Sequence, residues 1–142
     1  MKLATSYRRL NCKRLPLVLR AMFILAVVEF GLAACPRAAF KFWLSSTEPG
    51  KNRKLDDVDP TIQTVLEAIR SATRYVPGST NCLVQAISTK RMLADIGLKT
   101  YLRLGVASQK NPFMAHAWLE YDGKPVIGGE CIAQFTNSFP AL

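Results

Sequence analysis

A cysteine and a histidine in this chain could together perform nucleophilic chemistry. His116 is the only histidine, and it lies in "AHAWLEY", where alternating side-chain character predicts a β-strand. Cys82 lies 34 residues earlier and opens the stretch "CLVQAISTKRMLADIG", which has helical spacing. A thiolate paired with an imidazole is a nucleophile for carbonyl carbon. Their chemistry depends on whether the fold brings the two side chains together.

The position of Cys82 favours a reactive thiol. Before it, "YVPGSTN" breaks the helical pattern and supplies Ser79, Thr80 and Asn81 as capping candidates, so we expect a helix to begin at or near Cys82. Unpaired backbone N–H groups at a helix N-terminus favour the thiolate. The alternative is that Cys82 packs as a small hydrophobe, as most buried cysteines do. Likewise, a lone histidine on an apolar strand is more often a core residue than a catalytic base.

The elements around these two residues predict an α+β domain of helices on a small antiparallel sheet. Asp59 and Pro60 suit a helix start, and the helix from Cys82 should end at Gly97, a common left-handed terminator. Strands follow in "KTYLRLGVA" and "AHAWLEY", and the Asp122-Gly123 pair predicts a hairpin to a third strand, "KPVIG". The inward positions of the two helices are Ile62, Val65, Leu66, Ile69, Leu83, Ala86, Ile87, Leu93 and Ile96.

The charge is concentrated at the N-terminal end. The chain has 142 residues, the size of one domain, and a net charge of +9. Residues 1–54 carry eleven Lys or Arg and two acids, whereas residues 55–142 carry eight of each. Because the basic residues come without a recognition motif or interleaved aromatics, we expect no nucleic acid among the partners. We divide the chain into a basic, hydrophobic N-terminal helical region (1–44), a polar linker (45–59) and a core (60–142).

Two interpretations of the N-terminal region stay open. We favour a basic amphipathic helix from about Leu10 to Leu32 that packs on the domain, or lies on a membrane surface or a partner. The alternative is a signal or anchor, because "LAAC" ends in Cys35 and fits a lipoprotein cleavage pattern. Against a membrane span, the uninterrupted apolar run is only 21–28, between Arg20 and Glu29.

The four cysteines suggest no metal site and no cofactor. The cysteines form no C-x-x-C pair, and the chain has only one histidine as a further zinc ligand, so we expect no zinc site. An apolar chain of this size needs no disulfides, so we expect free thiols in a reducing, cytoplasmic compartment. Cys12, Cys35 and Cys131 are interpreted as structural or incidental.

A family resemblance joins Cys82 to His116. The segment "PGSTNCLVQAISTKRMLADIGLKTYLRLGVASQKNPFMAHAWLE", residues 77–120, resembles the transglutaminase-like cysteine peptidases. Within them it is most similar to the leader peptidases of lasso-peptide biosynthesis, the stand-alone B-type maturation proteins. These share Pro-Gly-x-x-x-Cys-Leu, a helix ending in glycine, "R-L-G-V" and "A-H-A-W-x-E". The basic, leucine-rich N-terminal helix is also similar to that family.

The resemblance implies hydrolysis of a peptide bond. The substrate would be a ribosomally made lasso-peptide precursor, which loses its leader before an ATP-dependent, asparagine-synthetase-like cyclase closes the macrolactam. A separate leader-recognition protein would deliver the precursor. Cys82 would be the nucleophile and His116 the base that activates it and then protonates the leaving amine. The backbone N–H of Cys82 would stabilise the oxyanion.

The third catalytic member does not carry over. The family's commoner pattern has an aspartate twelve residues after the histidine, where this chain has Gly128, followed by Gly129. A two-residue hairpin turn would place His116 opposite Gly129, and one more loop residue would place it opposite Gly128. Glu130, diagonal across the hairpin, is the acidic substitute, and a backbone carbonyl or side-chain amide could also orient the ring.

The other polar residues of the motif are assigned no chemistry. Glu120 is about 13 Å along the strand from His116, too far to reach it, and Asp122 has a sufficient role in the turn. Trp118 shares a strand face with His116, where it could shield the pair, line a groove or simply pack. Two rival functions remain: a non-catalytic binding protein on this scaffold, and a membrane-anchored lipoprotein.

Overall fold

The computed structural model of the chain describes residues 15–45, 60–77, 81–107, 114–135 and 137–140. The helices are α1 (Leu15–Ala34), α2 (Pro36–Ser45), α3 (Pro60–Ala72) and α4 (Cys82–Asp95). The strands are β1 (Tyr101–Ala107), β2 (Met114–Tyr121), β3 (Lys124–Ile127) and β4 (Asn137–Pro140), with a 3₁₀ helix η2 (Gly129–Gln134) before the last strand.

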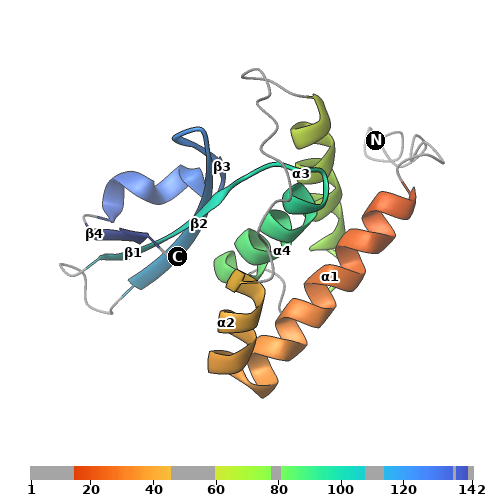
Figure 1. Cartoon of the computed structure of the whole chain (residues 1–142), viewed down its shortest axis with the longest axis horizontal. Coiled ribbons are helices and arrows are strands. Elements are labelled where there is room, and N and C mark those ends of the chain that lie inside the picture. Colours follow the sequence, from red (N-terminus) through yellow and green to blue (C-terminus); the bar gives the residue numbers. More distant parts are fainter. Residues whose placement is uncertain (1–14, 46–59, 78–80, 108–113, 136, 141–142) are drawn as a thin grey trace, which may run out of the picture.

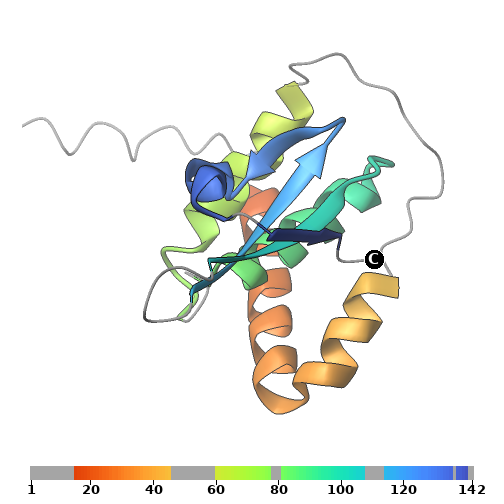
Figure 2. The same ribbon diagram turned by 90° about the vertical axis from the view of Figure 1, so that its left-hand side faces the viewer.

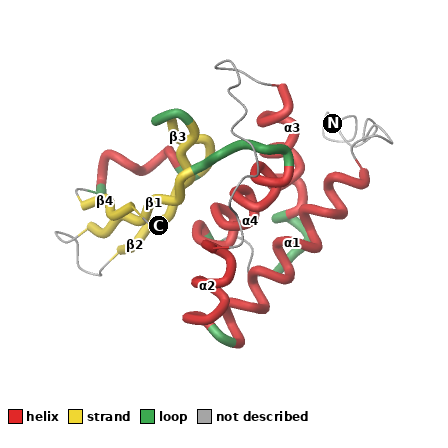
Figure 3. Tube along the Cα trace, in the orientation of Figure 1, coloured by secondary structure: helices red, strands yellow, loops and turns green. Residues whose placement is uncertain are grey.

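Helices and sheet form separate layers. In Figure 1 the four α-helices lie on one side of the molecule and the strands on the other, and α4 lies between α1 and the sheet. The view turned by 90° shows η2 beside the strands and α1 and α2 as an antiparallel pair of helices (Figure 2). The trace coloured by secondary structure shows the same division (Figure 3). The α+β class expected from the sequence is confirmed.

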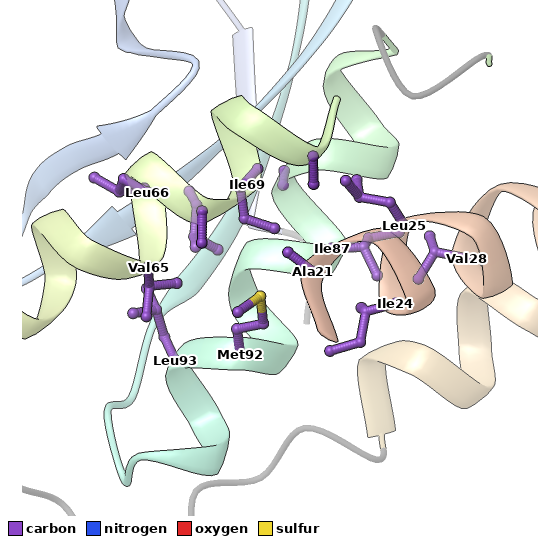
Figure 4. Close-up of a cluster of buried hydrophobic side chains, with 14 of the residues drawn as sticks. Ala21, Ile24, Leu25, Val28, Val65, Leu66, Ile69, Ile87, Met92 and Leu93 are labelled. Atoms are coloured by element: carbon purple, nitrogen blue, oxygen red, sulfur yellow. The ribbon is translucent and has the colours of Figure 1, made fainter. Parts of the chain in front are cut away.

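The core lies where α1, α3 and α4 meet. Figure 4 shows the apolar side chains of these three helices pointing toward one another. Ala21, Leu25 and Val28 of α1 are fully buried, as are Ile69 of α3 and Leu93 of α4. On the sheet side, the same cluster is completed by Leu98, Leu102, Ala117 and Leu119. All four predicted inward positions of α3 are buried.

Local sequence signals fix the ends of α4. Asn81 is its N-cap, because the Asn81 side chain accepts a hydrogen bond from the Leu83 N–H. At the other end Gly97 has φ 84, the left-handed conformation that glycine adopts without a Cβ penalty. The predicted start and stop of this helix are both confirmed.

The sheet has the order β3-β2-β1-β4 and is antiparallel in the three pairs that the structure describes. β1 and β2 pair so that Gly105 lies opposite His116. The predicted hairpin is present, and its turn residues Asp122 and Gly123 have φ 50 and 75, as a two-residue turn of this type requires. Strand β4 and η2 were not expected from the sequence.

The N-terminal region differs from the expected single helix. It forms two helices that meet at Cys35, with α1 running to Ala34 and α2 starting at Pro36. The part of the expected helix before Leu15, and the expected linker after Ser45, lie outside the described residues. Among those residues, α1 is the one helix long and apolar enough to cross a membrane, a property that core helices and signal sequences also have.

The described helix α1 is also not basic and amphipathic. Its one basic residue, Arg20, forms an ion pair with Asp95 of α4 at 2.6 Å, and most other side chains are apolar on both faces. The inner face packs on α3 and α4. Five of the eight basic residues in segment 1–44 lie in segment 1–14 of the sequence, before α1.

Candidate active site

Cys82 is the first residue of α4 and is half-buried against the core cluster. Its thiol lies 3.9 Å from the Asn81 Oδ1, a weak contact for a thiol donor. The Leu83 and Gln85 N–H groups are taken up by the Asn81 side chain and carbonyl at 3.0 and 3.1 Å. Among the described residues no acceptor is seen for the Cys82 N–H, which makes this N–H the candidate oxyanion donor.

The imidazole of His116 is held by a backbone carbonyl. His116 Nε2 lies 2.7 Å from the Gly128 carbonyl oxygen. A carbonyl oxygen can only accept a hydrogen bond, so Nε2 must carry the proton. In the neutral ring, Nδ1 then has the free lone pair and is the nitrogen that can act as a base. The structure therefore assigns an orienting group to His116 at the sequence position where the family resemblance expects an aspartate.

Two aromatic rings stack on the same imidazole. The centroid of His116 lies 5.2 Å from that of Phe135 and 6.2 Å from that of Trp118, with interplanar angles of 19° and 20°. Gly105, opposite His116, makes room for this arrangement. A Cβ at position 105 would lie 2.8 Å from Trp118 and 2.9 Å from Phe135, closer than real Cβ contacts allow.

The position of the Trp118 ring is in turn fixed by Glu120, a residue that was given no role from the sequence. The Trp118 indole N–H donates to one carboxylate oxygen of Glu120 at 2.9 Å, and Arg103 donates to the other at 3.0 Å. Trp118 is 2% exposed, so its buried N–H needs this acceptor. Glu120 does not contact His116 among the described contacts, but it positions the ring that stacks on His116. The i, i+2, i+4 spacing of His116, Trp118 and Glu120 places them on one face of a strand, and this was the sequence signal for the positioning role of Glu120.

The pairing of β2 with β3 corrects the expected register. The pairs run Tyr121 with Lys124 and Glu120 with Pro125, then shift at a bulge to Leu119 with Ile127. β3 ends there, so neither Gly128 nor Gly129 pairs with His116 as a strand partner. Instead Gly128, at φ 77, turns its carbonyl toward the ring.

Glu130, the expected acidic substitute, is exposed in the first turn of η2. None of the contacts that the structure describes joins it to His116, whose Nε2 is already taken by Gly128. From the sequence, a backbone carbonyl was the alternative to Glu130. In the structure the Gly128 carbonyl is the group that orients the His116 ring.

The nucleophile and base candidates lie on neighbouring elements. α4 packs against β2, and Figures 1 and 2 show the N-terminal end of α4 beside the first half of that strand. Within the described residues, no hydrogen bond joins Cys82 to His116: the thiol contacts Asn81 and the ring contacts Gly128. Successive side chains of a strand point to opposite faces of the sheet. Ala117 packs with the helices, so the His116 side chain next to it leaves β2 on the other face. The two groups are thus held by separate contacts.

Within the part of the chain that the structure describes, the remaining cysteines form no second site. Cys35 is free and exposed between α1 and α2, Cys12 lies outside the described residues, and only the backbone of Cys131 is described, in η2. The described residues contain no cluster of His, Cys, Asp or Glu that could hold a metal ion.

Comparison with protein families identifies the superfamily to which this chain belongs. The family model of the transglutaminase-like superfamily matches residues 24–139, from within α1 into β4, and so includes both Cys82 and His116. Searches of the curated proteins and of the solved structures find no match. Because the model covers most of the chain, the protein belongs to the transglutaminase-like superfamily, which includes cysteine peptidases.

Proposed function

We propose that this protein is a cysteine peptidase that removes the leader from a lasso-peptide precursor. The observation that carries the catalytic part is the bond from His116 Nε2 to the Gly128 carbonyl. It leaves Nδ1 as a base, on a strand next to a helix that begins with a cysteine. The family match supports a transglutaminase-like domain, and the leader-peptidase part rests on the sequence motif around Cys82 and His116.

The chemistry would follow the acyl-transfer route of a thiol nucleophile. The Cys82 thiol passes its proton to Nδ1 of His116, and the sulfur attacks the scissile carbonyl carbon. The developing oxyanion accepts a hydrogen bond from the Cys82 N–H. His116 returns the proton to the departing amine, which leaves a thioester on Cys82. Water, deprotonated by the same imidazole, then releases the leader as a free acid.

The substrate and partners follow from the resemblance. The precursor would arrive bound to a separate leader-recognition protein, and the released core would pass to an ATP-dependent, asparagine-synthetase-like cyclase. No cofactor is required for the hydrolysis.

The test is cleavage of a precursor by the purified full-length chain. The chain is incubated with the recognition protein and the precursor encoded nearest to it, and the products are identified by mass spectrometry. We expect a leader fragment with a free carboxylate from the wild type and none from Cys82→Ala or His116→Ala. Cys35→Ala is the matched control, because Cys35 is also a free thiol but lies exposed between α1 and α2; it should cleave like the wild type.

Two outcomes would overturn the proposal. Equal cleavage by Cys82→Ala would exclude the thiol as nucleophile. An amide product in the presence of added amines, with little free acid, would show acyl transfer in place of hydrolysis. A substrate-free measurement supports the assignment: iodoacetamide should alkylate Cys82 more slowly in His116→Ala than in the wild type, while the Cys35 rate stays unchanged.

A non-catalytic peptide-binding protein is the second candidate. The observation that favours it is the absence of a described hydrogen bond between Cys82 and His116. It predicts that Cys82→Ala binds the precursor as tightly as the wild type and that neither chain cleaves it.

The lipoprotein alternative is less well supported. Cleavage before Cys35 would remove α1, whose inner face supplies the fully buried Ala21, Leu25 and Val28 to the core.

A further inference from the structure

The outward face of α1 is apolar and uncovered among the described residues. Five large side chains on this helix are exposed: Leu15, Leu19, Phe23, Val27 and Phe30, with Phe23 and Phe30 at 71% and 77%. We call these five residues the α1 stripe. In Figures 1 and 3, α1 forms the outer edge of the helical layer.

The spacing of the α1 stripe makes it one continuous surface. Its members follow each other by four, four, four and three residues, which keeps them on one side of a helix at 100° per residue. The buried residues Val18, Ala21, Ile24, Leu25 and Val28 occupy the opposite side. A helix on the surface of a globular protein normally has a polar outer face, and one that is apolar all round is in a core or a membrane. The α1 stripe therefore needs an apolar partner.

The charges that precede and follow the α1 stripe in the sequence indicate the partner. Residues 1–14, immediately before the helix, contain Lys2, Arg8, Arg9, Lys13 and Arg14 and no acid. After it, α2 presents exposed Arg37 and Lys41 beside the exposed Phe42. In residues 15–45 the only acid is Glu29, whose Oε2 is buried. An apolar helix face between basic segments matches the interface of a bilayer that contains anionic lipid. Two copies packed through this face would bring like charges together.

We propose that the protein docks on anionic membrane surfaces through the α1 stripe, with α1 lying in the plane of the interface. A spanning orientation does not suit α1, because its inner face is packed on α3 and α4 and would have to leave the core. A 20-residue helix extends about 30 Å, enough to place all five side chains among lipid acyl chains at once. The proposal does not depend on which peptide the active site cleaves.

The test is sedimentation of the full chain with vesicles. Vesicles of phosphatidylcholine with about 30% phosphatidylglycerol are compared with phosphatidylcholine alone, at low and high salt. We expect binding to the anionic vesicles that weakens about tenfold or more in high salt or without phosphatidylglycerol. The triple variant Leu19→Ser, Phe23→Ser, Phe30→Ser should lose binding by about tenfold or more. Tyr75→Ser, which removes a 60% exposed aromatic from the segment after α3, is the matched control and should bind like the wild type.

A folding control and the other outcomes of the experiment decide whether the membrane proposal holds. Since the three substituted side chains are exposed, the triple variant should keep the wild-type circular dichroism and unfolding midpoint. Equal binding by the folded triple variant, or equal binding to neutral vesicles, would overturn the proposal. So would a dimer in light scattering that the triple variant abolishes, because the stripe would then be a protein interface. Protein that stays with the membrane after an alkaline carbonate wash would show a spanning helix instead.

Discussion

Replacing Gly128 with aspartate would supply the carboxylate that the family resemblance expects, and we predict that it impairs the proposed peptidase activity. Gly128 has φ 77, a conformation that costs an L-residue about 1–2 kcal/mol. A Cβ there would lie 2.9 Å from the Ala117 carbonyl oxygen and 3.1 Å from the Trp118 Cβ. Both contacts involve backbone or the root of a buried side chain, so neither yields easily.

The loss of stability caused by the clash is obtained by comparing Gly128→Asp with Gly123→Asp. Gly123 also has positive φ, 75, but a Cβ at that position meets nothing within 4 Å. Gly123→Asp therefore carries the same change in the unfolded chain and similar left-handed strain, without the clash. Overpacking of a filled site costs about 1–3 kcal/mol. We expect Gly128→Asp to be less stable than Gly123→Asp by about that amount.

Activity should fall as well, because relief of the clash moves the Gly128 carbonyl away from His116. Stability is measured by urea unfolding followed by tryptophan fluorescence, to which the buried Trp118 contributes. Activity is measured by precursor cleavage and by alkylation of Cys82 under conditions where both variants are folded. If Gly128→Asp cleaves as well as or better than the wild type, the carbonyl is not what orients His116.

Three further predictions concern the packing around the site. Gly105→Ala should destabilise the domain by about 1–3 kcal/mol in urea unfolding and slow alkylation of Cys82, since its Cβ would overlap the rings that stack on His116; unchanged values for both would refute this. Glu120→Ala, which leaves the Trp118 N–H buried without an acceptor, should cost about 1–3 kcal/mol, whereas Glu120→Gln can still accept that bond and should cost less; equal losses would show that the charge matters more. Leu25→Ala should cost about 2–5 kcal/mol because Leu25 is fully buried, against less than about 0.5 kcal/mol for the exposed Leu19→Ala; a harmless Leu25→Ala would mean that α1 is not part of the folded domain.

Local signals in the sequence were enough for the centre of the fold. The three-four spacing in α3, the Asn81 cap and Gly97 terminator of α4, and the Asp122-Gly123 turn each act through neighbouring residues only. Strand β4 could not be predicted, because "NSFP" is short, does not alternate and is a strand through its pairing with β1. The outward face of α1 was equally hidden, since a helix that is apolar all round has no periodicity to show which side is buried.

The candidate site was predictable in its side chains and not in its backbone. The resemblance around Cys82 and His116 identified the two elements that the structure places side by side. Glu130 was expected because the family pattern has a carboxylate at this site and Glu130 is the acid diagonal to His116 across the predicted hairpin. The group found on His116 is a main-chain carbonyl, which every residue has, so no residue type could mark it.

The carbonyl has a consequence for the proposed chemistry. A carboxylate would both orient the imidazole and stabilise the imidazolium that forms when the thiol gives up its proton. The Gly128 carbonyl orients the ring but carries no net charge, so it stabilises the imidazolium less. His116 is also confined by Phe135 and Trp118, whereas the Cys82 thiol has only a 3.9 Å contact with Asn81. For the peptidase reaction, the movement that joins the pair therefore falls to Cys82 and the first turn of α4, with the imidazole as the fixed member.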